Sequence, residues 1–202
     1  MSELFLFAYG SLLFEPERPD ALLERIPATW RGVRRAFNKT STGRGCAVDA
    51  TRVSALPAFE AKGRRLSLVL GTEPGDRIEG FVLRYGAAHA ADVLDRVNAR
   101  EGFVPGRAPA HNDYLPATVS VTLRGGQTVS ATAWKSNPSC GAYVGVLPIQ
   151  TVASVLRAAT PDTPGDRAQG TAYLEGVRRA LKASGRRDDH LDHVSLAITA
   201  LG

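Results

Sequence analysis

The sequence predicts an α+β fold in which helices flank a mixed sheet that is either open or closed as a small β-barrel. Three observations predict it. The chain opens with a continuous apolar run, its middle consists of short strand-like segments around a single helical segment, and its last third has helical periodicity throughout. No repeat, low-complexity tract or linker divides the 202 residues. We therefore expect one domain over residues 1–202.

The opening run predicts a strand over residues 4–9, and because it is apolar on both faces we expect this strand at the centre of the sheet. A short helix is expected over residues 20–26, where Pro19 and Asp20 resemble a helix start. Further strands are predicted at residues 30–40, 66–70, 78–85, 115–123 and 127–135.

Turn residues define how these strands pair. Residues 73–76 predict a turn that makes an antiparallel pair of the strands at 66–70 and 78–85. Gly125 and Gly126 predict a hairpin between the last two strands. Helices are predicted at residues 87–101, 148–158, 168–183 and from Asp188 or Asp189 to the C-terminal residues.

Composition limits the classes of partner. The net charge of +5 and the pI near 9.6 permit a nucleic-acid ligand, but the basic residues are spread along the chain and form no run interleaved with aromatics. We expect a small anionic substrate and no nucleic acid. Cys46 and Cys140 form neither a disulfide framework nor a metal motif, and the N-terminal apolar run is too short for a signal peptide or membrane span. We therefore expect a cytoplasmic protein without a membrane partner, and the oligomeric state stays open.

The segment Tyr9-Gly10-Ser11-Leu12 directly follows the opening strand. Successive backbone N–H groups in a turn can form an anion-binding concavity, and the Ser11 hydroxyl is a further donor. We expect these four residues to hold a substrate carboxylate. The alternative interpretation is an ordinary turn after a strand.

Glu101 ends the central predicted helix, and Gly102 is its stop signal. A carboxylate there faces the negative pole of the helix, which should raise its pKa and suit it to proton transfer. The alternative is a solvated glutamate paired with Arg100.

Two other kinds of site are not supported by the sequence. His190 and His193 are three residues apart on a helix, but no further ligand cluster completes a metal site. Ser11 lacks the sequence context of a hydrolase nucleophile.

Taken together, Tyr9-Gly10-Ser11-Leu12 and Arg100-Glu101-Gly102 resemble the γ-glutamylcyclotransferase superfamily, and its ChaC-like branch matches best. Three further segments are similar to that branch in the same order. They are Arg34-Arg35-Ala36-Phe37 with Ser41, Ala142-Tyr143-Val144-Gly145 with Pro148, and Ser184-Gly185-Arg186-Arg187, where Arg187 replaces the usual Asn.

The resemblance implies a small β-barrel flanked by helices and an enzyme that cyclises a γ-glutamyl group, as in glutathione, to 5-oxoproline with release of the attached amine. It implies Glu101 as general acid/base and substrate binding by Tyr9 to Leu12, to which we add Arg35 and Tyr143. No metal, nucleotide or prosthetic group is expected. A non-catalytic domain of the same fold that binds a small acid or a protein partner remains the alternative. The long segment 43–64 is expected to be mobile and to govern which leaving group is accepted.

Overall fold

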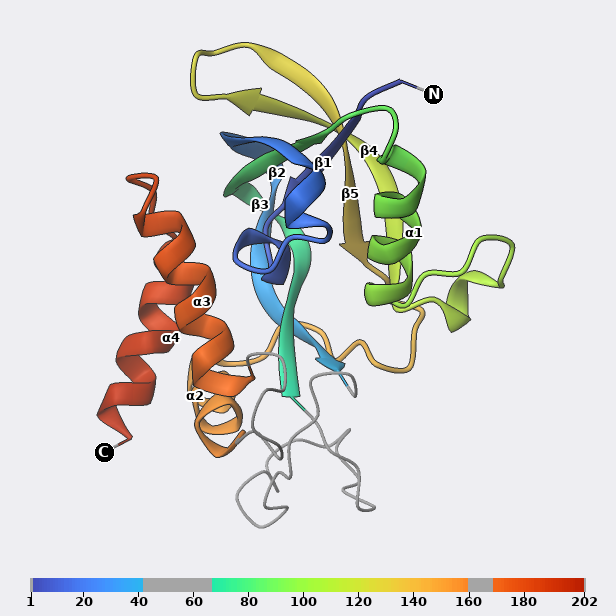
Figure 1. Cartoon of the computed structure of the whole chain (residues 1–202). Coiled ribbons are helices and arrows are strands. Elements are labelled where there is room, and N and C mark those ends of the chain that lie inside the picture. Colours follow the sequence, from blue (N-terminus) through green and yellow to red (C-terminus); the bar gives the residue numbers. More distant parts are fainter. Residues whose placement is uncertain (1, 42–66, 160–168, 202) are drawn as a thin grey trace.

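The computed structural model describes residues 2–41, 67–159 and 169–201, so the expectations for segment 43–64 lie outside the described residues. Within these ranges, five strands form a closed barrel in the order β1-β3-β2-β4-β5 (Figure 1). The strands are β1 (Leu4–Ala8), β2 (Leu22–Ser41), β3 (Ser67–Tyr85), β4 (Tyr114–Leu123) and β5 (Thr128–Ser136). The α-helices are α1 (Ala90–Arg100), α2 (Ile149–Ala158), α3 (Gly170–Lys182) and α4 (Asp189–Ala200). The predicted barrel flanked by helices is confirmed.

Strand β1 lies between two neighbours, as its apolar sequence predicts. It pairs antiparallel with β3 and parallel with β5. Its side chains alternate between two cores: Leu6 and Ala8 belong to one apolar cluster, whereas Phe7 and the following Tyr9 belong to the other. Because both faces of β1 are buried, the Tyr9–Leu12 segment that follows it begins in the interior of the fold.

The prediction that residues 66–70 and 78–85 form two paired strands is wrong. The two segments form one continuous strand, and both pair with β2, Leu70 with Phe37 and Val82 with Ile26. The predicted turn at residues 73–76 is instead an irregular stretch of the ladder, where the register shifts and Pro74 lies opposite Val33. Proline is tolerated at such bulges because the ladder there lacks regular hydrogen bonds.

The helix predicted at residues 20–26 is wrong. A 3₁₀ turn, η2, covers Pro19–Ala21, and β2 begins at Leu22. Pairing with β3 decides the conformation, since the first residues of β2 lie opposite the last ones of β3 and Glu24 forms an ion pair of 2.8 Å with Arg84. The strand predicted at residues 30–40 is therefore only the second half of β2, and the remaining predicted helices and strands agree with the structure to within a few residues.

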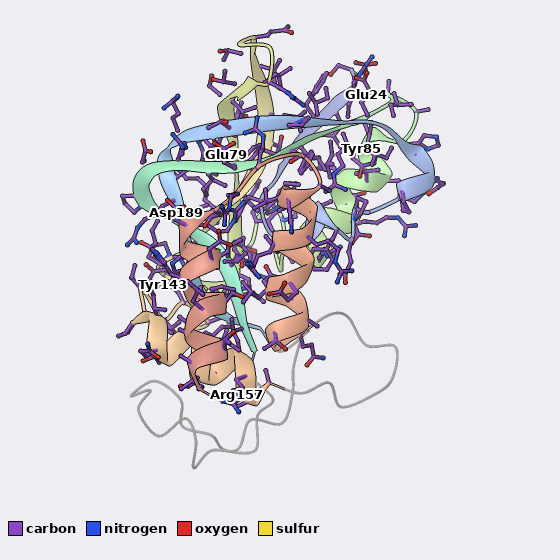
Figure 2. The ribbon with its side chains drawn as sticks, turned by 90° about the vertical axis from the view of Figure 1, so that its left-hand side faces the viewer. Glu24, Glu79, Tyr85, Tyr143, Arg157 and Asp189 are labelled. Carbon is purple, nitrogen blue, oxygen red and sulfur yellow. The ribbon has the colours of Figure 1, made fainter. Side chains whose placement is uncertain are left out.

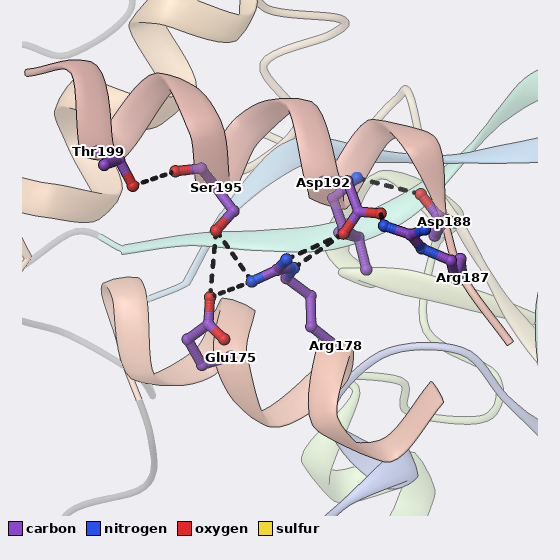
Figure 3. A network of polar contacts seen from close by, with 8 residues as sticks. Glu175, Arg178, Arg187, Asp188, Asp192, Ser195 and Thr199 are labelled. Carbon is purple, nitrogen blue, oxygen red and sulfur yellow. Dashed lines mark hydrogen bonds and ion pairs between the residues drawn. The ribbon is translucent and has the colours of Figure 1, made fainter. Parts of the chain in front are cut away.

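Helices α2, α3 and α4 lie on one side of the barrel and α1 lies on the other (Figure 1). Figure 2 looks onto the side formed by α3 and α4. Arg178 of α3 joins this pair by donating to Asp192 and Ser195 of α4 and to Glu175 of its own helix (Figure 3). No helix among the described residues has both the length and the apolar character needed to cross a membrane.

Candidate active site

A cavity of about 90 Å³ lies at the end of β1 and brings together the two sequence segments predicted to form a site. It is lined by Phe7, Tyr9, Gly10, Ser11, Leu12, Lys39, Val69, Leu70, Arg100, Glu101, Tyr114, Trp134 and Tyr173. Aromatic and aliphatic residues are the most numerous in this wall, and polar and charged groups lie among them. Such a combination is typical of sites for small molecules.

The Tyr9–Leu12 segment leaves β1 and enters a 3₁₀ turn, η1 (Ser11–Leu13), whose N-cap is Gly10. The turn is closed by the N–H of Leu13, which donates to the carbonyl of Gly10 at 3.0 Å. The first N–H groups of a helical turn have no partner within the turn. The N–H groups of Ser11 and Leu12 therefore belong to the class of donors that can bind an anion.

Gly10 contributes space to this segment. Its φ is −112°, so it does not use the left-handed conformation that favours glycine. A Cβ at this position would lie 3.2 Å from the hydroxyl of Tyr173, which itself accepts a hydrogen bond from the Leu70 N–H at 3.3 Å. The absent side chain thus lets the tyrosine of α3 approach the backbone closely.

Glu101 is the C-cap of α1, and the helix ends there in a Schellman motif. The N–H of Phe103 donates to the carbonyl of Asn98 at 2.9 Å, and that of Gly102 to the carbonyl of Ala99 at 3.3 Å. Gly102 has a φ of +64°, which this motif requires after the C-cap. The motif therefore fixes the backbone from which the Glu101 side chain reaches the cavity.

Arg100 fastens the end of α1 to the chain that follows η1. Its side chain is only 6% exposed, and its guanidinium donates to the carboxylates of Glu15 and Glu17 at 3.1 and 2.9 Å. These acids lie shortly after the Tyr9–Leu12 segment in the sequence. The arginine therefore fixes the position of the helix end that carries Glu101 relative to that segment.

Tyr9 and Tyr114 give the cavity a polar but uncharged wall. Burial raises the pKa of both phenols well above the usual value, and the nearby charge of Glu101 raises each further. The Tyr9 hydroxyl donates to the carbonyl of Trp134, and the Tyr114 hydroxyl donates to that of Leu70 at 2.7 Å. Both phenols therefore stay protonated around neutral pH and keep the cavity walls ordered.

Arg35 and Tyr143, predicted to bind substrate, do not line this cavity in the described part of the chain. The buried guanidinium of Arg35 donates to the backbone carbonyls of Tyr9, at 2.9 Å, and Glu79, and it pairs with Asp188 at the start of α4. The Tyr143 hydroxyl donates to Glu73 at 2.6 Å. The structure thus places Arg35 behind the Tyr9–Leu12 segment and Tyr143 against β3.

The cavity residues that were not predicted as site residues include four with polar or aromatic side chains outside the predicted motifs: Lys39, Tyr114, Trp134 and Tyr173. They come from β2, β4, β5 and α3, and none has a local motif. Of these four, only Lys39 has a sequence feature that could have indicated a site. It is a charged residue in a strand with buried neighbours, and such a residue needs a partner.

A larger hollow of about 550 Å³ lies away from Glu101, around the turn between α3 and α4. Charged side chains line it, and several of these already form ion pairs. Arg186 pairs with Glu79, and Arg187 pairs with Asp192 at 3.2 Å. Among the described residues, no group of three or more histidine, cysteine or acidic side chains is arranged to hold a metal ion.

Comparison with known proteins gives a consistent result for nearly the whole chain. The family model described as ChaC-like protein matches residues 4–200. A selenomethionine-labelled yeast γ-glutamyl cyclotransferase specific to glutathione has the same fold, with a TM-score of 0.73 at 19% identity over 99% of this chain and 97% of that one. A second γ-glutamyl cyclotransferase structure gives 0.51 at 12% identity over 96% and 87%. No curated protein matches the sequence significantly.

Proposed function

Because this chain belongs to the ChaC-like family, we propose that it is a γ-glutamylcyclotransferase that converts the γ-glutamyl group of glutathione or a related compound to 5-oxoproline and releases the attached amine. One observation supports the proposal most directly. Glu101 and the Tyr9–Leu12 segment, which are distant in the sequence, line the same cavity.

In the proposed complex, the α-carboxylate of the γ-glutamyl group binds the backbone N–H groups at the start of η1 and the Ser11 hydroxyl. Hydrogen bonds from several N–H groups to one carboxylate are charge-assisted and fix its orientation. The α-amine then faces Glu101 across the cavity. This binding mode uses only the part of the substrate that all γ-glutamyl compounds share.

Glu101 transfers the proton in both halves of the reaction. Its carboxylate takes a proton from the α-ammonium, and the freed nitrogen attacks the γ-carbonyl carbon to form the C–N bond of the five-membered ring. Glu101 then returns this proton to the departing nitrogen as the original C–N bond breaks. The ring nitrogen loses its second proton to become the lactam N–H, and the released amine takes that proton up as an ammonium. Proton transfer by a positioned side chain contributes about 10²–10⁴-fold to the rate.

The cavity also supplies orientation. The nucleophile and the carbonyl belong to one molecule, so the protein needs only to hold the glutamyl chain in a nearly closed conformation. Good orientation of this kind contributes roughly 7–11 kcal/mol to lowering a barrier. The ordered tyrosine hydroxyls and the apolar walls at Phe7, Val69 and Leu70 suit this task, because they limit the conformations that fit.

The volume of the cavity limits how much of the substrate can bind inside it. Its volume of about 90 Å³ is well below the roughly 300–1,000 Å³ of pockets for drug-sized ligands. It suits a glutamyl group and leaves the amine part of the substrate outside. The yeast relative named as specific to glutathione makes glutathione the first compound to test.

The experiment is a substrate panel with a direct product readout. Purified protein is incubated with glutathione, γ-glutamyl dipeptides and γ-glutamylamines, and 5-oxoproline is measured by mass spectrometry. We expect 5-oxoproline from at least one γ-glutamyl compound and none from α-glutamyl dipeptides, the matched controls. If no member of the panel gave 5-oxoproline, the domain would instead be a binding module of this fold.

A further inference from the structure

Lys39 lies in the wall of the cavity, and its residue surface is only 4% exposed. Lysine is almost never buried to this degree without a partner, because removing an ammonium from water is costly. Strand β2 carries this residue into the interior four positions after Arg35. A buried cation in the cavity that Glu101 also lines therefore needs contacts that stabilise its charge.

Two contacts hold the ammonium. Its Nζ lies 2.9 Å from Oδ2 of Asp113 and 4.2 Å from the centre of the Tyr114 ring. Asp113 also lies close to the helix end that carries Glu101, since its N–H donates to the carbonyl of Gly102 at 3.1 Å. Lys39 is therefore brought near Glu101 through Asp113 and Gly102.

Asp113 does not cancel the charge of Lys39 on the cavity side. The Asp113 side chain is 46% exposed, so water screens its charge, whereas the Lys39 side chain is 5% exposed. The other cation that lines the cavity, Arg100, is bound to the carboxylates of both Glu15 and Glu17. Among the described residues that line the cavity, Lys39 is thus the cation most available to a bound group.

We propose that Lys39 is a catalytic residue whose ammonium stabilises the negative charge that forms on the γ-carbonyl oxygen. The inference rests on the proposed cyclisation. When Glu101 accepts the proton of the substrate ammonium, Glu101 becomes neutral. As the amine nitrogen bonds to the γ-carbon, the π electrons of the C=O bond move to the oxygen, so negative charge appears inside the cavity.

A fixed ammonium suits this shift of charge. Before reaction it shares the cavity with the carboxylate of Glu101, and in the proposed tetrahedral intermediate it faces the new oxyanion, while its own position is kept by Asp113 and Tyr114. Preorganised charge in a water-poor site is worth more than in water, and losing one such donor costs about 10²–10³ in kcat. When the leaving nitrogen departs, the electrons return to re-form C=O.

The test compares Lys39→Met with Asp113→Asn, using 5-oxoproline formation by steady-state kinetics. Methionine keeps the length and apolar contacts of the side chain and removes the ammonium. We expect Lys39→Met to lower kcat by about 10²–10³ and to change KM by less than about threefold. Asp113→Asn, which breaks the ion pair but keeps the ammonium, should retain kcat within about tenfold.

Results that would overturn the role of Lys39 can be told apart from a failure of the proposed function. Equal losses in Lys39→Met and Asp113→Asn would show that only the ion pair matters and would overturn the inference. An increase in KM restricted to substrates whose leaving group carries a carboxylate would assign Lys39 to that group and would also overturn it. Both results require an active parent protein. An inactive parent across the whole substrate panel would instead refute the proposed function, and this inference with it.

Discussion

The guanidinium of Arg35 donates to the carbonyl of Tyr9 from outside the cavity. The C=O and N–H of a trans peptide point in opposite directions, so holding this carbonyl directs the N–H of Gly10 the other way. A loop that binds a carboxylate through backbone N–H groups needs its peptide planes fixed in this manner. We therefore infer that Arg35 positions the loop and does not itself contact substrate.

Arg35→Lys tests this role. Lysine keeps a positive charge beside Asp188 but loses the Nε–H that donates to Tyr9. We expect the protein to fold and KM to rise about tenfold, the effect of roughly 1.4 kcal/mol, with a smaller change in kcat. Arg34→Lys is the matched control, because Arg34 is exposed on the same strand and its substitution should leave KM unchanged. Equal KM values for both variants and the parent would refute the positioning role.

The end of α1 illustrates what local sequence signals can and cannot predict about an element. Gly102 predicts the helix end, and the structure confirms it because a Schellman motif requires its positive φ. The packing around it was not predictable. A Cβ at Gly102 would lie 2.8 Å from the Cβ of Asp113, a residue that belongs to the segment before β4.

Gly102→Ala should therefore be harmful for two reasons, the left-handed backbone and the contact with Asp113. We expect the free energy of unfolding to fall by about 1–3 kcal/mol, measured by chemical denaturation. Turnover should also fall, because the helix end carries Glu101. Gly106→Ala provides a control with a similar φ of +77° but no atom within 4 Å of the added Cβ, so it should show the backbone cost alone. Equal losses of stability and activity in both variants would contradict the role of the Asp113 contact.

Sequence-based prediction was least accurate where pairing over long distances decides the conformation. Residues 73–76 have the composition of a turn, yet pairing with β2 keeps them within one strand. Residues 22–26 of the predicted helix belong to β2, because they pair with β3. Local propensity cannot anticipate such pairing, because the partner is far away in the chain.

Over the whole molecule, the cavity is built from all five strands, from α3, from the end of α1 and from the segment around η1. The sequence predicted its two motif-bearing parts, Tyr9–Leu12 and Glu101, because each has a local signature. Lys39 and Tyr173 reach the cavity only through the closure of the barrel and the packing of α3. No local pattern in the sequence encodes that arrangement.

The two apolar clusters offer a test of the single domain expected from the sequence. Trp30 is buried in one cluster and Trp134 in the other. In Trp134→Phe and Trp30→Phe variants, the remaining tryptophan reports on one cluster. We expect the fluorescence transition in urea to coincide with that of circular dichroism in each variant, as in a cooperative domain. Separate transitions for the two probes would show that the clusters unfold independently.

The most direct test of the account is the rate of 5-oxoproline formation by the parent and by Glu101→Gln. Glutamine keeps the size of the side chain and removes the base, so the variant should fold as the parent does and still bind substrate through the Tyr9–Leu12 segment. We expect turnover to fall by about 10²–10⁴, the usual contribution of a positioned proton-transfer group. Formation of 5-oxoproline at the parent rate by Glu101→Gln would contradict the proposed mechanism.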